Sequence, residues 1–381
     1  MSREQPISYQ SPANGKAFAS YRPRVASSGR PVATALQEFG ARPLIGQCLR
    51  HVGGVHQPLS VEGAGINPVW EIRSEVLHFQ LGPLRLGEVK LKAFTLVSNP
   101  FVVDAELAIP MAQAAAQDCR AVVVSAMPIG KRFATMSFDR GALRYAARYG
   151  DRYVVDLQGL FAEYIKKFSK KSRGNLQRAA RKFEKGIDSV PPILEYRSSS
   201  EIIAFRDIAV AISRASYKSD LGWGFQEDES FAREIELDAV AGRVRGYVLM
   251  SGREPAAYVF CRIDHDVIVY KHIGYDERFA QSSPGTVLLY LMLHRLFKES
   301  EFRLLDFDGT EYYAYKEFFA TRAISCARLF WFPLRPPEIV LFGAHWVITA
   351  AWRFASLLRD HIRRGKRGWV SARTHLRRTP Q

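Results

Sequence analysis

One segment near the carboxyl end of the chain gathers residue types that suit group transfer. Ser283, Pro284, Gly285 and Thr286 stand between a strand-like run that ends at Tyr275 and a strongly apolar run over 286–298. Pro at a helix start has no N–H, and the N–H groups that follow it have no partners inside the helix. These donors and the positive end of the helix dipole form a site for a phosphate or pyrophosphate. A helix cap that binds nothing is the structural alternative.

Charged residues follow this segment at short spacing. Asp306 and Asp308 are two positions apart, so a strand would place both side chains on one face. An acid pair there suits the binding or deprotonation of an acceptor amine or hydroxyl. Lys316 offers a fixed positive charge for an acyl carbonyl or a phosphate. A turn with a solvated acid, and a surface lysine, are the corresponding structural alternatives.

His272 lies on the preceding strand-like run and is a candidate general base, with a hydrogen-bonded structural histidine as the alternative. The chain shows neither a Gly-x-Ser-x-Gly motif nor a papain-like cysteine signature. We therefore expect direct transfer between donor and acceptor, without a covalent enzyme intermediate.

The elements around these residues predict an α/β fold. Its sheet is expected to be mixed, with parallel and antiparallel strands, as in an α+β arrangement. A three-strand meander comes first, followed by an apolar helix, a strand, a short helix and a last strand. Their expected ranges are 244–250, 256–263, 267–275, 286–298, 302–307, 311–319 and 324–332. The first half shows a shorter series of the same kind, with strands at 76–81, 89–94 and 121–125 and a helix over 101–117. We therefore expect two related lobes.

The pattern along the chain predicts four parts. Residues 1–35 mix Ser, Pro, Gly and Arg without periodicity and are predicted to be a disordered lead-in. The two lobes are expected over 36–150 and 151–332, and an apolar helix with a polybasic tail over 333–381.

The chain is strongly basic, with 54 Lys and Arg against 38 Asp and Glu, a formal net charge of +16. This charge favours polyanionic partners such as nucleic acid, anionic lipid or phosphorylated small molecules. A helix predicted over 161–185 concentrates Lys and Arg, but its aromatic residues have core spacing, so nucleic-acid binding is not specifically indicated. The four cysteines share no metal-ligand spacing, which argues against a zinc site and fits a reducing compartment. The N-terminal residues have no apolar core, so we expect no secretory signal.

The C-terminal segment over 339–352 is apolar and contains aromatic residues, but we judge it too short to span a bilayer of about 30 Å. Nine Lys and Arg then follow within residues 353–381, with Asp360 as the single acid. Such a segment suits peripheral attachment to an anionic membrane. A helix docked on one lobe, followed by a disordered tail, is the alternative.

The motifs in the second half resemble a known family. Gly274-Tyr275-Asp276, Ser283-Pro284-Gly285, Asp306-Phe307 and Tyr315-Lys316 occur in the order and spacing of the GNAT-superfamily acetyltransferase-like domain related to biotin and cellulose biosynthesis proteins. The basic stretch over 168–186 is similar to the helix that precedes this domain. The resemblance covers about residues 150–332, whereas the first half matches by architecture alone.

The resemblance implies two acetyltransferase-like (GNAT) lobes and a cytoplasmic acyltransferase that uses a coenzyme A thioester, acetyl-CoA or a longer acyl-CoA, without a metal. Its acceptor would be an amino compound, a sugar, or a cell-envelope or exopolysaccharide precursor. The family is also similar to Fem-type peptidyltransferases, which use aminoacyl-tRNA, and Tyr315-Lys316 with Phe319 matches their aromatic-Lys-x-x-Phe sequence. The Gly that follows in those enzymes is Ala320 here, which puts a tRNA donor in doubt. A non-catalytic membrane-associated assembly protein with the same fold is the third interpretation.

Overall fold

The structure is a computed structural model that describes residues 67–103, 107–132, 134–139, 141–184, 192–216, 224–352 and 354–356. The predicted lead-in over 1–35 and most of the polybasic tail therefore lie outside the described residues, as does Cys48.

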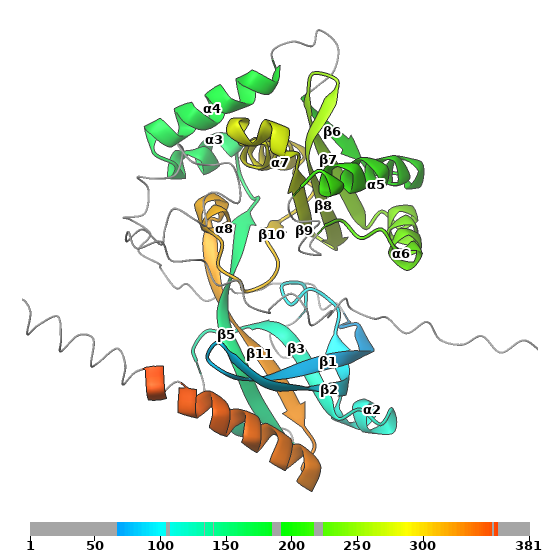
Figure 1. The fold of residues 1–381 in the computed structure, drawn as a ribbon, viewed down its shortest axis with the longest axis vertical. Helices are drawn as coiled ribbons and strands as arrows, with labels where there is room; N and C mark the ends of the chain where they lie inside the picture. Colours follow the sequence, from blue (N-terminus) through cyan, green and yellow to red (C-terminus); the bar gives the residue numbers. More distant parts are fainter. Residues whose placement is uncertain are drawn as a thin grey trace, which may run out of the picture.

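All described strands belong to one 11-stranded mixed sheet, which confirms the predicted fold class (Figure 1). The strand order is β1-β2-β3-β11-β5-β10-β9-β8-β7-β6, and β4 pairs with β5 alone. The strands of the first half are β1 (Trp70–Leu81), β2 (Leu84–Leu96), β3 (Ala121–Pro128), β4 (Met136–Asp139) and β5 (Ala142–Asp156). The second half contributes β6 (Ile193–Tyr196), β7 (Val244–Ser251), β8 (Glu254–Asp264), β9 (Val267–Tyr275), β10 (Leu304–Asp306) and β11 (Arg322–Phe332).

Two long strands, β5 and β11, run from one lobe into the other (Figure 1). They are antiparallel neighbours, and β11 also pairs with β3, so the last strand of the chain completes the lobe built by the first half. The predicted domain boundary between residues 150 and 151 falls inside β5, and the division into domains remains a prediction.

Helices cover both faces of the second lobe (Figure 1). They are α3 (Phe161–Tyr164), the 3-10 turn η1 (Ile165–Lys167), α4 (Lys170–Glu184), α5 (Ser199–Arg214), α6 (Glu229–Val240), the 3-10 turn η2 (Glu277–Ser282), α7 (Pro284–Glu299) and α8 (Ala314–Phe319). The apolar residues of α3, α4 and α7 form one core with Val155, Leu249 and Ile268 of the sheet. Those of α5 and α6 form a second core on the opposite face.

Two predicted helices have different limits in the structure. The helix predicted over 101–117 is reduced to α2 (Met111–Ala116), because Pro110 disfavours helical backbone in the residue before it. Residues 101–103 instead form a turn whose side chains are buried, and the Asn99 side chain accepts the Phe101 N–H at 2.9 Å. The helix predicted over 161–185 is interrupted at Phe168, whose backbone is extended. Ser169 then begins α4 by accepting the Ser172 N–H at 3.1 Å.

The C-terminal helix, Pro336–Ser356, has 21 residues and is long and apolar enough to cross a membrane by length and composition. The expectation that this apolar segment is too short to span was therefore wrong, because the helix extends beyond 339–352 at both ends. It lies along the first lobe, at the far end of the molecule from α4 (Figure 1).

His345 ties this helix to the sheet. Its Nδ1 lies 2.6 Å from the Tyr145 hydroxyl and its Nε2 lies 3.1 Å from the His78 carbonyl oxygen, so a neutral ring with the proton on Nε2 satisfies both contacts. Burial lowers the pKa of His345, and the charges of Arg328 and His78 act in the same direction, against the hydrogen bond to the His78 carbonyl.

We expect acidification to weaken the docking of the C-terminal helix. Because the pKa of His345 is lower in the folded protein, the unfolded chain binds more protons below its ordinary pKa of about 6.5. The stabilisation is therefore complete above that pH and is lost as the pH falls towards the lowered value. Thermal unfolding at about pH 7.5 and at about pH 5.5, on either side of the ordinary histidine pKa, tests this prediction. The variant His345→Gln, which does not titrate, should show a smaller fall in Tm than the natural chain, and an equal fall would contradict the assignment.

Candidate active site

A β-bulge in β9 decides where the side chains of its middle residues point. Phe260 of β8 faces His272, whereas Cys261 faces Tyr270, so Lys271 is one residue more than the β8 ladder accommodates. Tyr270 consequently lies in the core beneath α7, and His272 lies on the opposite face although it is only two residues away.

Strands β9 and β10 run parallel for only three residue pairs and then separate. Their pairing ends at Asp306 and Val269, whereas β9 continues to Tyr275. After β10 the chain turns sharply, with Asp308 and Gly309 both at positive φ, 49° and 63°. The two parallel strands therefore open towards their carboxyl ends, where ligands bind in open α/β sheets.

Helix α7 follows the carboxyl end of β9 after the 3-10 turn η2. Its first residue is Pro284, and Ser283 precedes it in the left-handed conformation, with φ 54° and no side-chain hydrogen bond that caps the helix. The first backbone N–H to bond within the helix is that of Val287, which donates to the Ser283 carbonyl at 3.1 Å. The predicted phosphate-binding residues Ser283, Pro284, Gly285 and Thr286 thus form a helix N-terminus, and all four are buried.

Asp306 is fully buried, and its carboxylate is held from three sides. Arg152 Nε donates to its Oδ1 at 2.8 Å, and the second guanidinium nitrogen bonds Oδ2. The Asn99 amide donates to Oδ2 at 2.8 Å, and the Asp308 backbone N–H donates to Oδ1 at 3.0 Å. Burial opposes the charge on Arg152, but Asp306 and Asp308 outweigh it and raise the pKa of the guanidinium. The guanidinium therefore keeps its charge, and the ion pair joins residues of both halves of the chain.

Asp308 is half-buried and lies at the edge of the same cluster. Its Oδ1 accepts from Arg152 at 3.0 Å and its Oδ2 from Lys271 Nζ at 2.6 Å. Burial opposes ionisation, but the charges of Lys271 and Arg152 prevail and hold the pKa of this carboxyl well below its usual range. Asp308 is therefore an anion at neutral pH, and it suits binding of a cationic or hydrogen-bonding group better than accepting a proton.

Lys316 is buried and stabilises the turn after β10. Its Nζ donates to the Asp308 carbonyl oxygen at 2.7 Å and lies 5.2 Å from the centre of the Tyr313 ring. Burial lowers the pKa of Lys316, against the attraction of Asp308, Glu311 and Asp306. The structure thus brings three predicted site residues, Asp306, Asp308 and Lys316, into one cluster.

His272 is placed apart from this cluster by the bulge. Its ring packs among the rings of Phe225, Phe231 and Phe260, with centroid distances of 5.6, 6.1 and 6.2 Å. This aromatic packing favours a structural role for His272, and its role as general base remains a prediction.

Sequence reasoning missed three members of the cluster, Asn99, Arg152 and Lys271. Asn99 and Arg152 are 207 and 154 residues away from Asp306, so no local spacing points to them. Lys271 is adjacent to His272, and its role depends on the bulge. The sequence carries no clear signal for Arg152, because β5 also holds Arg144, Arg148 and Asp151, and only the structure shows that Arg152 is the buried one.

Two tyrosines line the core between the cluster and α7. The rings of Tyr270 and Tyr315 lie 6.2 Å apart, and Phe307 packs against both. Burial raises the pKa of both phenols, so both stay protonated at neutral pH.

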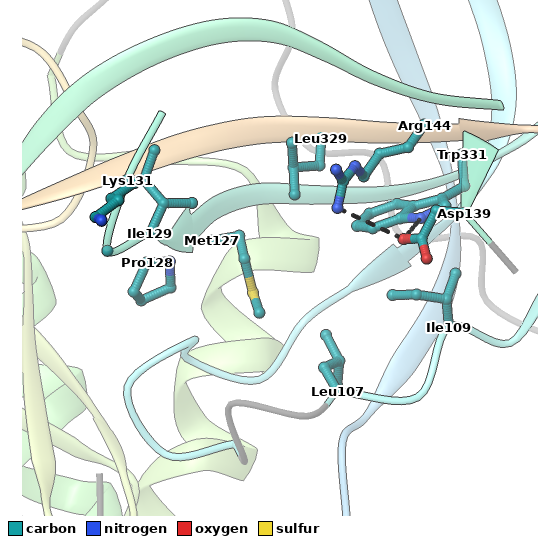
Figure 2. A pocket seen from close by; sticks show the side chains of 11 residues that line it. Leu107, Ile109, Met127, Pro128, Ile129, Lys131, Asp139, Arg144, Leu329 and Trp331 are labelled. Carbon is teal, nitrogen blue, oxygen red and sulfur yellow. Dashed lines mark hydrogen bonds and ion pairs between the residues drawn. The ribbon is translucent and has the colours of Figure 1, made fainter. Parts of the chain in front are cut away.

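A separate hollow of about 300 Å³ lies in the first lobe, away from α7 (Figure 2). Its rim carries Asp139, which accepts from Trp331 Nε1 at 3.0 Å and lies 3.7 Å from Arg144 Nη1. Its remaining lining is mostly apolar and comprises Leu107, Ile109, Met127, Pro128, Ile129, Gly130, Lys131 and Leu329. The hollow is open and none of the predicted site residues lines it.

Residues 170–317 match the family model described as an acetyltransferase (GNAT) domain. The fold is GNAT-like. The match covers β9, β10, the start of α7 and the cluster residues Asp306, Asp308 and Lys316, whereas Asn99 and Arg152 precede it. It supports an acyltransferase activity, and the narrower resemblance to biotin and cellulose biosynthesis proteins remains a prediction.

Solved structures that the chain matches include FemX, with a TM-score of 0.44 and 12% identity over 71% of this chain and 90% of that one. The C-terminal domain of a putative lysylphosphatidylglycerol synthetase from Agrobacterium fabrum has a TM-score of 0.42 and 10% identity, over 68% and 85%. A tandem GNAT protein from the clavulanic acid biosynthesis pathway has a TM-score of 0.34 and 14% identity, over 65% and 79%. No curated protein matches the sequence. These likenesses carry no conclusion about the reaction.

Proposed function

We propose that the chain is an acyl-CoA-dependent N- or O-acyltransferase of the GNAT type, which transfers the acyl group directly to its acceptor. One observation carries the proposal: a buried helix N-terminus follows a strand, β9, whose carboxyl-terminal half has separated from its parallel neighbour β10. This arrangement falls within the residues that match the acetyltransferase (GNAT) domain model.

The donor half of the site would consist of Ser283, Pro284, Gly285 and Thr286. The N-terminus of α7 suits the pyrophosphate of a coenzyme A thioester, acetyl-CoA or a longer acyl-CoA, because its backbone donors and dipole favour negative charge. The amide groups of the extended arm of the donor can add to the edge of β9 beyond Val269, where β10 no longer follows it. The thioester would then lie near Tyr270 and the charged cluster.

The acceptor half would use Asp308 and Lys271, which reach the edge of the cluster. Asp308 can hold an acceptor amine or hydroxyl by accepting a hydrogen bond from it. Attack on the thioester carbonyl forms the new C–N or C–O bond, and the C–S bond then breaks. The departing thiolate takes up a proton, and the acceptor releases one to water. Asp306 and Lys316 position this machinery through Arg152 and the turn at Asp308, and His272 has no assigned step.

Acceptors of the proposed enzyme are amino compounds, sugars, or cell-envelope or exopolysaccharide precursors, as the family resemblance implies. We place the enzyme in the cytoplasm, peripheral to the inner membrane. Cys119, Cys261 and Cys326 are free thiols among the described residues, in agreement with a reducing compartment.

Isothermal titration of the full chain with coenzyme A and with acetyl-CoA tests the proposal. We expect saturable binding, and absence of binding at millimolar concentrations would refute it. The release of free thiol on addition of candidate amines and sugars then measures transfer.

A second candidate function, a Fem-type transferase that uses aminoacyl-tRNA, is favoured by the surface of α4. Its buried residues, Ser172, Leu176, Ala180 and Phe183, form one face. The opposite face carries exposed Lys170, Lys171, Arg178, Arg181 and Lys182, which suit a phosphate backbone. Tight, salt-dependent tRNA binding without coenzyme A binding would favour this function. Absence of both, in a folded chain, would favour a non-catalytic assembly protein.

A further inference from the structure

The C-terminal helix has one face that the first lobe covers. Glu338, Phe342 and His345 lie on this face and are buried. The Glu338 carboxylate accepts from Arg120 Nε at 3.0 Å, and the Phe342 ring packs against those of Tyr145 and Phe332. With the contacts of His345 to Tyr145 and His78, these interactions fix which way the helix is rotated.

The opposite face of the helix is apolar and exposed. Val340, Val347 and Phe354 recur every seven residues and are 71%, 56% and 71% exposed. Ala344 and Ala351, both exposed, lie between them. The sequence has no charged side chain from Ile339 to Trp352, whereas the outward face of a helix on a soluble protein normally carries polar residues. We call Val340, Ala344, Val347, Ala351 and Phe354 the apolar face.

The apolar surface continues from the helix onto the β1–β2 turn. Trp352 packs so closely over Gly82 that a Cβ at Gly82 would lie 2.2 Å from the indole ring. Leu84 and Leu86, at the start of β2 directly after this turn, are 58% and 52% exposed. The exposed apolar surface thus comes from two separate elements that pack together, as in a docking surface rather than a chance feature of one helix.

The charge of the adjoining sequence indicates the partner. Residues 357–381, directly after the helix, contain eight Lys and Arg and one acid. An apolar helix face that is followed in sequence by a polybasic segment suits an anionic bilayer in two ways. The apolar side chains can be buried below the lipid headgroups, and the basic side chains are attracted to the negative charge at the membrane surface. We propose that the apolar face is a membrane-docking surface, and that the C-terminal helix lies flat in the interface of an anionic bilayer.

The docked face explains why the helix lies in the interface although it is long enough to cross. A helix of this length rises about 32 Å, close to the thickness of the hydrocarbon core. Crossing would break the contacts of Glu338 and His345 with the lobe and place both polar side chains in lipid. Lying flat keeps these contacts and buries only the apolar face. This inference does not depend on the proposed acyl transfer.

Vesicle flotation of the full chain tests the proposal, with vesicles rich in phosphatidylglycerol compared with vesicles of phosphatidylcholine alone. We expect partition into the anionic vesicles and weakening by salt. The double variant Val340→Glu/Val347→Glu should reduce the partition coefficient at least about 10-fold, because two apolar groups that the bilayer would bury become charges. The matched control is Leu237→Glu/Val240→Glu on α6, where both residues are also exposed, at 68% and 75%, and it should bind like the natural chain. Circular dichroism confirms that each variant is folded.

Three outcomes would overturn the proposal. The first is equal vesicle binding by the natural chain and the apolar-face variant. The second is a lipid-free dimer that the apolar-face variant converts to a monomer with vesicle binding unchanged, which would make this face an interface between copies. The third is resistance of the membrane-bound chain to alkaline carbonate extraction, which would show a spanning helix. Release by carbonate supports the flat arrangement.

Discussion

Replacing Gly285 by Asp is expected to weaken coenzyme A binding about 100-fold, or about 2.8 kcal/mol. The new carboxylate stands in the first turn of α7, where the proposed pyrophosphate would bind, and the two negative charges repel. An acidic residue in the first turn is otherwise favourable to a helix, so the helix itself should persist. Isothermal titration measures the loss, and thermal unfolding shows whether the variant is folded.

Two further variants separate the effect of the new negative charge at position 285 from that of the added side-chain volume, and from that of an aspartate introduced elsewhere in the chain. Gly285→Ala adds a methyl group without charge, and we expect a smaller loss of binding than with Asp. Gly174→Asp makes the same substitution in α4, where a Cβ meets no atom within 4 Å, and should leave the affinity for coenzyme A unchanged. If the Gly285→Asp variant binds coenzyme A as tightly as the natural chain does, the donor site lies elsewhere in the protein.

Replacing Asp306 by Leu is expected to lower the free energy of unfolding by about 3–5 kcal/mol. Arg152 would remain buried, at 5% exposure, without its main partner, and the amide of Asn99 would lose its acceptor. The half-buried carboxylate of Asp308 offsets part of this cost, which places the expected value near the lower end of the range. Urea unfolding followed by circular dichroism measures the change.

The double variant Arg152→Met/Asp306→Leu should recover part of the lost stability, because it removes the uncompensated charge together with its partner. The milder Asp306→Asn tests the role in catalysis. If Asp306 positions the site, activity and stability should fall together in this variant. A stable Asp306→Asn enzyme that has lost only kcat, with a changed pH profile, would instead identify Asp306 as a proton acceptor.

Local patterns were sufficient for the meander, the apolar helix and their order. Strands β7, β8 and β9 alternate with tight turns, and α7 is an apolar run after Ser-Pro-Gly, so short-range sequence rules place them close to their observed limits. The same rules failed over 101–117, where a helix-like composition gives way to a buried turn held by Asn99. Apolar residues there fill a core contact, and tertiary packing outweighed helix propensity.

The charged cluster shows the same division between local and tertiary information. Asp306, Asp308 and Lys316 are close in sequence and also lie close together in the structure, but their assignment to one site came mainly from the family resemblance and remains a prediction. Their environments were not predictable, because Asn99 and Arg152 come from distant parts of the chain. Sequence distance carries no information on such pairs, and the resulting ion pairs decide which carboxylate is buried and which reaches the surface.

The sequence by itself thus determined the helix start at Ser283 to Thr286 and its position after a strand, since capping and dipole effects act within a single turn. Only the tertiary structure decided that β9 and β10 diverge ahead of this helix start, that Lys271 rather than His272 reaches Asp308, and that the C-terminal helix keeps one apolar face exposed. The physical reason is common to all three: a β-bulge, a strand separation and a docked helix face each depend on contacts between residues far apart in the chain.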